Sequence, residues 1–158
     1  MPKELVVGTE VFEFPEQGEN AGWGEQVTDW AIAVTDALET VQAPGDILVT
    51  TAVISNNISS AASIVGFSFN STEVASFTAE YYIERNTNVP AVFLTQRGTL
   101  TGLYNGSSWD FTNQFFGSSG VTFSITSGGQ VQYISTNMTG SNYAGTVTFS
   151  AKAITQPA

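Results

Sequence analysis

Residues 74–84 read VASFTAEYYIE, and this stretch shows most clearly which class of fold the chain adopts. One alternate set of positions is apolar and comprises Ala75, Phe77, Ala79, Tyr81 and Ile83. The other set is mostly polar and comprises Ser76, Thr78, Glu80, Tyr82 and Glu84. Because successive side chains of a strand point to opposite faces, the pattern predicts a β-strand with one buried face.

Similar runs continue to the end of the chain. Residues 121–126 and 147–153 alternate between apolar and small polar side chains, whereas residues 47–54 are apolar on both faces, as is typical of an inner strand. Turn-forming residues separate the runs. Asn105-Gly106 is the clearest of these, because both central positions of a type I′ hairpin turn need positive φ. About eight such strands predict an all-β, jelly-roll-like antiparallel sandwich over residues 46–158.

The first 22 residues have a different character. They show little periodicity and mix acidic residues with proline and glycine, so we expect an extended N-terminal arm over 1–22. Its apolar side chains are too many for a free tail, and we expect them to contact either their own domain or a neighbouring subunit. The candidate capsid or subunit contacts are Val6, Val11, Phe12, Phe14 and Trp23.

Residues 23–45 are predicted to form an amphipathic helix and its termination at Pro44-Gly45. Apolar residues recur there at steps of three and four, namely Val27, Trp30, Val34, Leu38 and Val41. This spacing fits a helix packed on the adjacent sheet. It also fits a short self-association seam of the coiled-coil type, and the sequence leaves both hypotheses open.

Charge is unevenly distributed along the chain. There are 14 acidic and 4 basic residues, and ten of the acids lie within the first 46 residues together with only one base. Phosphate backbones and anionic lipids attract basic residues, so we expect neither nucleic acid nor a membrane as partner. The chain starts without a signal-peptide pattern, and its apolar runs are too short to cross a bilayer.

The sequence contains neither histidine nor cysteine. Their absence excludes disulfides, the usual nucleophile pairs and nearly all zinc sites. Glu80 and Glu84 would lie about 13 Å apart on one strand face, too far for a glycosidase pair. No calcium-loop or phosphate-loop spacing occurs. We therefore expect a protein that is not an enzyme and that uses no cofactor and no small-molecule substrate.

Aromatic residues crowd around one predicted hairpin, and they are Tyr104, Trp109, Phe111, Phe115 and Phe116. Such a group is suited to stacking on sugars, but a sandwich core also needs large side chains. Trp109 is the best single candidate for recognition at the surface.

Two longer patterns resemble virion structural proteins of tailed bacteriophages. The first runs from Phe14 to Gly18, from Gly22 to Trp30 and from Ala33 to Leu38; the second runs from Gly98 to Gly106, with Trp109 and then Gly128 to Tyr133. In that group such a domain occurs alone, as a capsid decoration or cement protein, or within fibre-like proteins.

The resemblance implies a structural subunit of the virion, assembled in the cytoplasm of the host bacterium and bound to the major capsid protein. Together with the short helical seam, it implies a homotrimer at threefold or quasi-threefold positions of the head. Two alternatives remain. One is a head-fibre or tail-fibre component with a host-recognition β-domain, and the other is a carbohydrate-binding module.

Overall fold

The computed structural model describes residues 3–7, 10–14, 28–34 and 43–157. The chain divides into two compact units, residues 1–42 and 43–158, and each unit is treated by itself.

In the described part of the N-terminal unit there are two short strands and one helical segment. Strands β1 (Lys3–Val7) and β2 (Glu10–Phe14) pair antiparallel, with Val6 opposite Val11. Residues 3–7 and 10–14, expected to belong to an extended arm, therefore form a small sheet of their own. Residues 28–34 are helical, inside the region 23–45 predicted to hold a helix and its termination. Residues 23–27 and 35–42 lie outside the described residues, and Pro44-Gly45 lie in a turn, as predicted. No helix in the described ranges is long and apolar enough to span a membrane.

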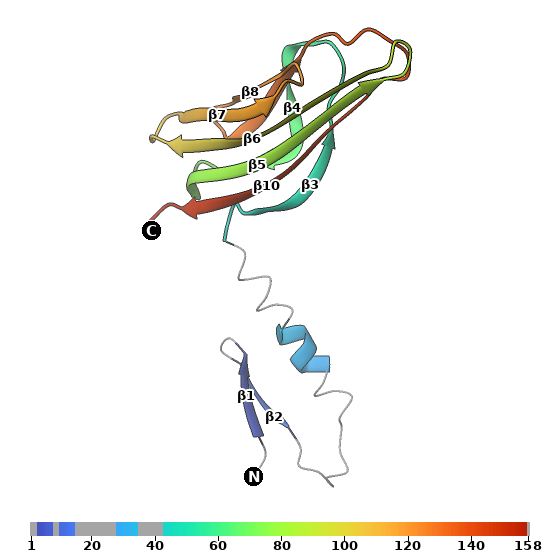
Figure 1. The fold of residues 1–158 in the computed structure, drawn as a ribbon. Helices are drawn as coiled ribbons and strands as arrows, with labels where there is room; N and C mark the ends of the chain where they lie inside the picture. The colour runs from blue at the N-terminus through green and yellow to red at the C-terminus, as the bar shows by residue number, and fades with distance from the viewer. Residues whose placement is uncertain (1–2, 8–9, 15–27, 35–42, 158) are drawn as a thin grey trace. The chain divides into compact units, whose positions relative to one another are not determined.

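The second unit is a β-sandwich of eight strands (Figure 1). The strands are β3 (Ile47–Val53), β4 (Ile58–Ser68), β5 (Val74–Thr87), β6 (Val92–Tyr104), β7 (Trp109–Gly117), β8 (Val121–Ile125), β9 (Gln130–Ser135) and β10 (Ala144–Thr155). One sheet has the order β3-β10-β5-β6-β7 and the other has the order β4-β9-β8. All neighbouring strands are antiparallel, which confirms the predicted sandwich.

Aromatic side chains from both sheets fill the space between them. Phe67 of β4 stacks on Phe149 of β10 with ring centroids 4.1 Å apart, and Phe69 stacks on Phe77 of β5 at 3.7 Å. All four are fully or almost fully buried. Burying a phenylalanine side chain contributes roughly 1.5–3 kcal/mol, so these two pairs are a large part of what holds the sheets together.

The alternation predicted for β5 is confirmed in most of the strand. Phe77, Ala79, Tyr81 and Ile83 are buried, whereas Thr78, Glu80 and Tyr82 are exposed. The pattern slips at the start of the strand, where Val74 rather than Ala75 is fully buried. The pairing between β5 and β10 shifts register at this point, and the shift moves the buried position by one residue.

The prediction that residues 47–54 form an inner strand is wrong. Strand β3 lies at the edge of the five-stranded sheet, next to β10. Its inner face contributes Ile47 and Ala52, which pack against the core. Its outer face carries apolar side chains that nothing in residues 43–157 covers.

A buried arginine ties together the loops at one end of the sandwich. Arg85 of β5 is 0% exposed, and its guanidinium donates hydrogen bonds to the Tyr143 hydroxyl, the Asn56 side-chain oxygen and the backbone oxygens of Ser119 and Thr136. These four acceptors come from three different connections between strands. A buried charge needs such partners, because leaving water costs several kcal/mol.

Candidate functional site

The outer face of the five-stranded sheet carries the most distinctive exposed side chains of the sandwich. One row of register partners crosses all five strands, and it comprises Thr51 on β3, Thr148 on β10, Tyr82 on β5, Arg97 on β6 and Phe116 on β7. Because register partners on neighbouring strands point to the same face, these side chains form a continuous line. The row combines hydroxyl groups, two aromatic rings and one guanidinium.

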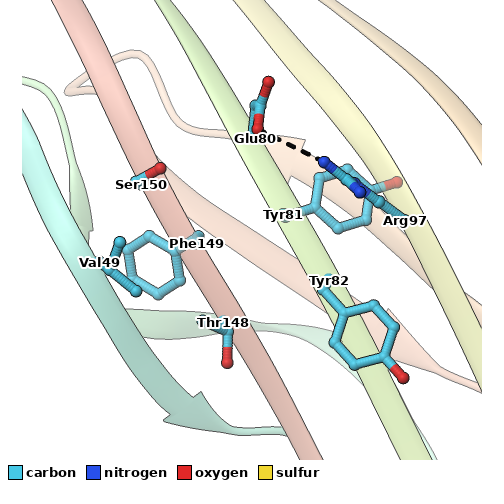
Figure 2. A pocket seen from close by; sticks show the side chains of 8 residues that line it. All are labelled: Val49, Glu80, Tyr81, Tyr82, Arg97, Thr148, Phe149 and Ser150. Atoms are coloured by element: carbon cyan, nitrogen blue, oxygen red, sulfur yellow. Dashed lines mark ion pairs between the residues drawn. The ribbon is translucent and has the colours of Figure 1, made fainter.

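An exposed ion pair lies beside this row. The guanidinium of Arg97 and the carboxylate of Glu80 approach to 3.8 Å, and Figure 2 shows the two side chains reaching toward each other next to Tyr82. Exposed pairs of this kind contribute little to stability, since water and salt screen them. Both groups are therefore available to a binding partner.

Three shallow hollows lie side by side on the same face, and all three share Glu80 in their lining. The central hollow, of about 240 Å³, is lined by Val49, Tyr82 and Arg97 among others (Figure 2). Another, of about 340 Å³, reaches Leu48 and Lys152, and a third, of about 200 Å³, reaches Phe116. Small-molecule sites usually have roughly 300–1,000 Å³ and enclose their ligand. Two of the hollows are smaller than this, and the third is near the lower limit and open to solvent, so the face has the form of a contact surface.

Apolar side chains are exposed at both edges of this sheet. On β3, Leu48 is 72%, Val49 77% and Val53 74% exposed. On β7, Phe115 is 53% and Phe116 88% exposed. Single exposed apolar residues are common, but several on one strand mark a site of interaction. We call these two groups the β3 edge and the β7 edge.

One acidic group of the sandwich, Asp46, is engaged in structural contacts. Asp46, just before β3, accepts hydrogen bonds from the Lys152 ammonium group at 2.7 Å and from the Ala153 backbone N–H at 2.7 Å. These hydrogen bonds lower the pKa of Asp46 below its ordinary value. The described residues contain no group of three or more acidic, histidine or cysteine side chains placed to hold a metal ion.

Trp109 is not a surface recognition residue, and this prediction is corrected. Its side chain is 7% exposed and lies in the core, with ring centroids 5.5 Å from Phe77 and 5.4 Å from Tyr104. Trp109 begins β7 at a position that points inward, whereas Phe116 points outward. Phe115 and Phe116 are the exposed aromatic residues of this hairpin.

The N-terminal candidates are placed only in part. Val6, Val11, Phe12 and Phe14 lie on β1 and β2, where the structure describes the backbone alone. Trp30 and Val34 lie on the helical segment 28–34 and are half-buried. The remaining candidates, Trp23, Val27, Leu38 and Val41, lie outside the described residues. Their roles in capsid contact and self-association stay predictions.

No protein-family model matches this chain, and no curated protein sequence matches it. The fold and the outer sheet face are therefore the observations on which a functional hypothesis has to rest.

Proposed function

We propose that this protein is a structural subunit of a bacteriophage virion, a decoration or cement protein that binds the major capsid protein and stabilises the head as a homotrimer. One observation carries the proposal. Strand β3 has the residue pattern of an inner strand, yet it lies at a sheet edge with Leu48, Val49 and Val53 exposed. Such a strand is typical of a protein that buries this surface against another chain.

Two further features support an assembly role. The chain divides into a small N-terminal unit and a sandwich, which is consistent with one part serving for attachment and the other for the exposed domain. The outer face has the shallow form of a protein contact, and its carboxylate Glu80 pairs with Arg97. The assignment to a phage particle comes from the sequence resemblance described above.

Imaging of virus particles tests this proposal. Particles of the phage that encodes the chain would be compared by electron cryo-microscopy with particles from a mutant lacking it. We expect trimeric density at threefold or quasi-threefold positions of the wild-type head and its loss in the mutant. Heads that are identical with and without the chain would contradict the proposal.

The alternative is a head-fibre or tail-fibre component whose β-domain recognises the host. The row of Tyr82, Arg97 and Phe116 favours it, because exposed aromatic residues and arginine are enriched at recognition surfaces. Deletion of residues 1–22 separates the two functions. A decoration protein would lose capsid binding, whereas a fibre domain would keep its binding to host cells.

A further inference from the structure

The β3 edge has few of the devices that keep sheet edges apart, and the one it shows is a register shift against β10 at Leu48 and Val49. Its sequence, ILVTTAV, contains no charged residue and no proline. The Ile54 N–H donates a hydrogen bond to the Gly145 oxygen of β10. Because the backbone N–H and C=O groups of successive residues in a strand point to opposite sides, those of Val53 and Thr51 point toward the free edge. No strand within residues 43–157 pairs with that edge.

The β7 edge, at the opposite side of the same sheet, is equally open. β7 pairs with β6 over nine consecutive residue pairs without a register shift, and its single charged residue is Asp110, far from Phe116. The Ser118 N–H donates to the Thr95 oxygen of β6, so the backbone groups of Phe115 and Asn113 point away from β6. Natural proteins protect such edges with lysine, proline or a covering segment.

Charge allows two copies of the sandwich to meet at these edges. Residues 43–158 contain five acidic and three basic residues, a net charge of −2, whereas residues 1–42 carry −8 of the total of −10. The carboxylates that lie beside the exposed apolar side chains have basic partners. Asp46 lines a hollow with Leu48 and pairs with Lys152, and Glu80 lines hollows with Val49 and Phe116 and pairs with Arg97. Contact between a β3 edge and a β7 edge therefore brings no unpaired carboxylate of these hollows against another.

Two kinds of edge contact between copies are possible, a head-to-tail contact of unlike edges and a twofold contact of like edges. Since all neighbours in the order β3-β10-β5-β6-β7 are antiparallel, β3 and β7 run in the same direction. A head-to-tail contact would place the aliphatic β3 edge of one copy against the aromatic β7 edge of the next. A twofold contact of like edges would leave the other edge open, whereas a closed head-to-tail ring leaves none.

We propose that copies of this chain associate head to tail, with the β7 edge of one copy bound to the β3 edge of the next, in a ring of three. The size of the ring rests on the trimer in the proposed function, and the contact itself rests on the two edges.

Two single substitutions test the contact on the purified full chain. Val49→Lys blocks the β3 edge and Phe116→Lys blocks the β7 edge. Both side chains are more than three-quarters exposed, so the sandwich should fold as before. Thr101→Lys adds the same charge to an exposed position on the inner strand β6 and serves as the matched control. Thermal melting of all three variants checks that they are folded.

Sedimentation equilibrium gives the expected result directly. The wild type and Thr101→Lys should have three times the chain mass of 16.8 kDa, and each edge variant alone should dissociate at least tenfold more readily. An equimolar mixture of the two edge variants should form a one-to-one dimer, because one partner keeps an intact β7 edge and the other an intact β3 edge.

The proposal would be overturned by a monomeric wild type at tens of micromolar, by a trimer that survives in both edge variants, or by a mixture of the variants that forms no dimer. Loss of association in only one variant would indicate a twofold contact and would also contradict the ring. Capsid binding plays no part in this measurement, so its outcome can be separated from that of the proposed function.

Discussion

The Arg85 guanidinium and the Asn56 side chain are joined by a hydrogen bond of 3.1 Å, which links β5 to the connection between β3 and β4. Asn56 in turn accepts a hydrogen bond from the Met138 N–H at 2.8 Å. Two loops and one strand are thus joined through the Asn56 side chain.

Replacement of Arg85 by methionine should destabilise the sandwich strongly. The substitution keeps much of the side-chain volume but leaves the Ser119 and Thr136 oxygens without this donor, and it removes one of the two donors to the Asn56 oxygen. Unsatisfied buried acceptors cost about 1–3 kcal/mol each, so we expect the free energy of unfolding to fall by about 3 kcal/mol or more. Urea denaturation measures this value. Arg97→Met, at an exposed position, should change it by less than about 0.5 kcal/mol, and equal effects of the two variants would show that the buried contacts are unimportant.

Stability should fall in acid, partly because of Asp46. Its pKa is lowered in the folded protein, first by the hydrogen bond from Lys152 and then by that from Ala153. A lowered folded-state pKa gives stability that is fully present above the unfolded value and is lost as the pH falls through the folded value. Asp46→Asn should therefore reduce stability at pH 7 by about 1–2 kcal/mol. The difference from the wild type should shrink below about pH 4.

Denaturation curves at several pH values between 7 and 3 test this prediction. Glu84→Asn is a suitable control, because that carboxylate has only a long contact of 3.4 Å from the Tyr82 hydroxyl. A difference between Asp46→Asn and the wild type that stays constant across the range would contradict the proposed role of the ionised carboxylate.

Two glycines with positive φ should respond differently to alanine. A Cβ at Gly129 would lie 1.7 Å from the Phe69 oxygen and 3.2 Å from the Trp109 indole nitrogen, whereas a Cβ at Gly106 meets nothing within 4 Å. In both variants an alanine must adopt an unfavourable positive φ, which costs about 1 kcal/mol of stability. Gly129→Ala must also displace backbone in the core, so we expect it to lose several degrees more in melting temperature than Gly106→Ala. Equal melting temperatures would contradict the close packing around Trp109.

The sandwich and its inner faces could be predicted from the sequence because alternation is a local property. Phe77, Tyr81, Phe123 and Phe149 each have polar neighbours in the chain, and all four are buried as expected. Continuing the same alternation by two residues beyond Ile83 would have placed Arg85 on the inner face, and this signal was missed. Its acceptors could not be found, because they come from loops distant in sequence.

The two errors have a common physical cause. The pattern of residues 47–54 indicates how many faces are apolar, but it cannot tell whether the second face is covered by the same chain or by another. Trp109 follows a loop of four residues, and the position where β7 begins decides which face it joins. Only Gly106 of the predicted Asn105-Gly106 turn has positive φ, since the Asn105 side chain bonds to the Ser107 and Ser108 N–H groups instead. Strand order and loop geometry thus decide which of these side chains are exposed, and sequence periodicity does not reveal either of them.

Hydrogen exchange at the free sheet edges tests the central claim, that another chain covers them, most directly. The backbone amides of Thr51, Val53, Asn113 and Phe115 point away from their neighbouring strands in an isolated sandwich. In the associated wild-type protein we expect these four amides to exchange at least tenfold more slowly than in the Val49→Lys and Phe116→Lys variants. Equally fast exchange of all four amides in the wild type and both variants, at concentrations where the wild type should be trimeric, would contradict the account.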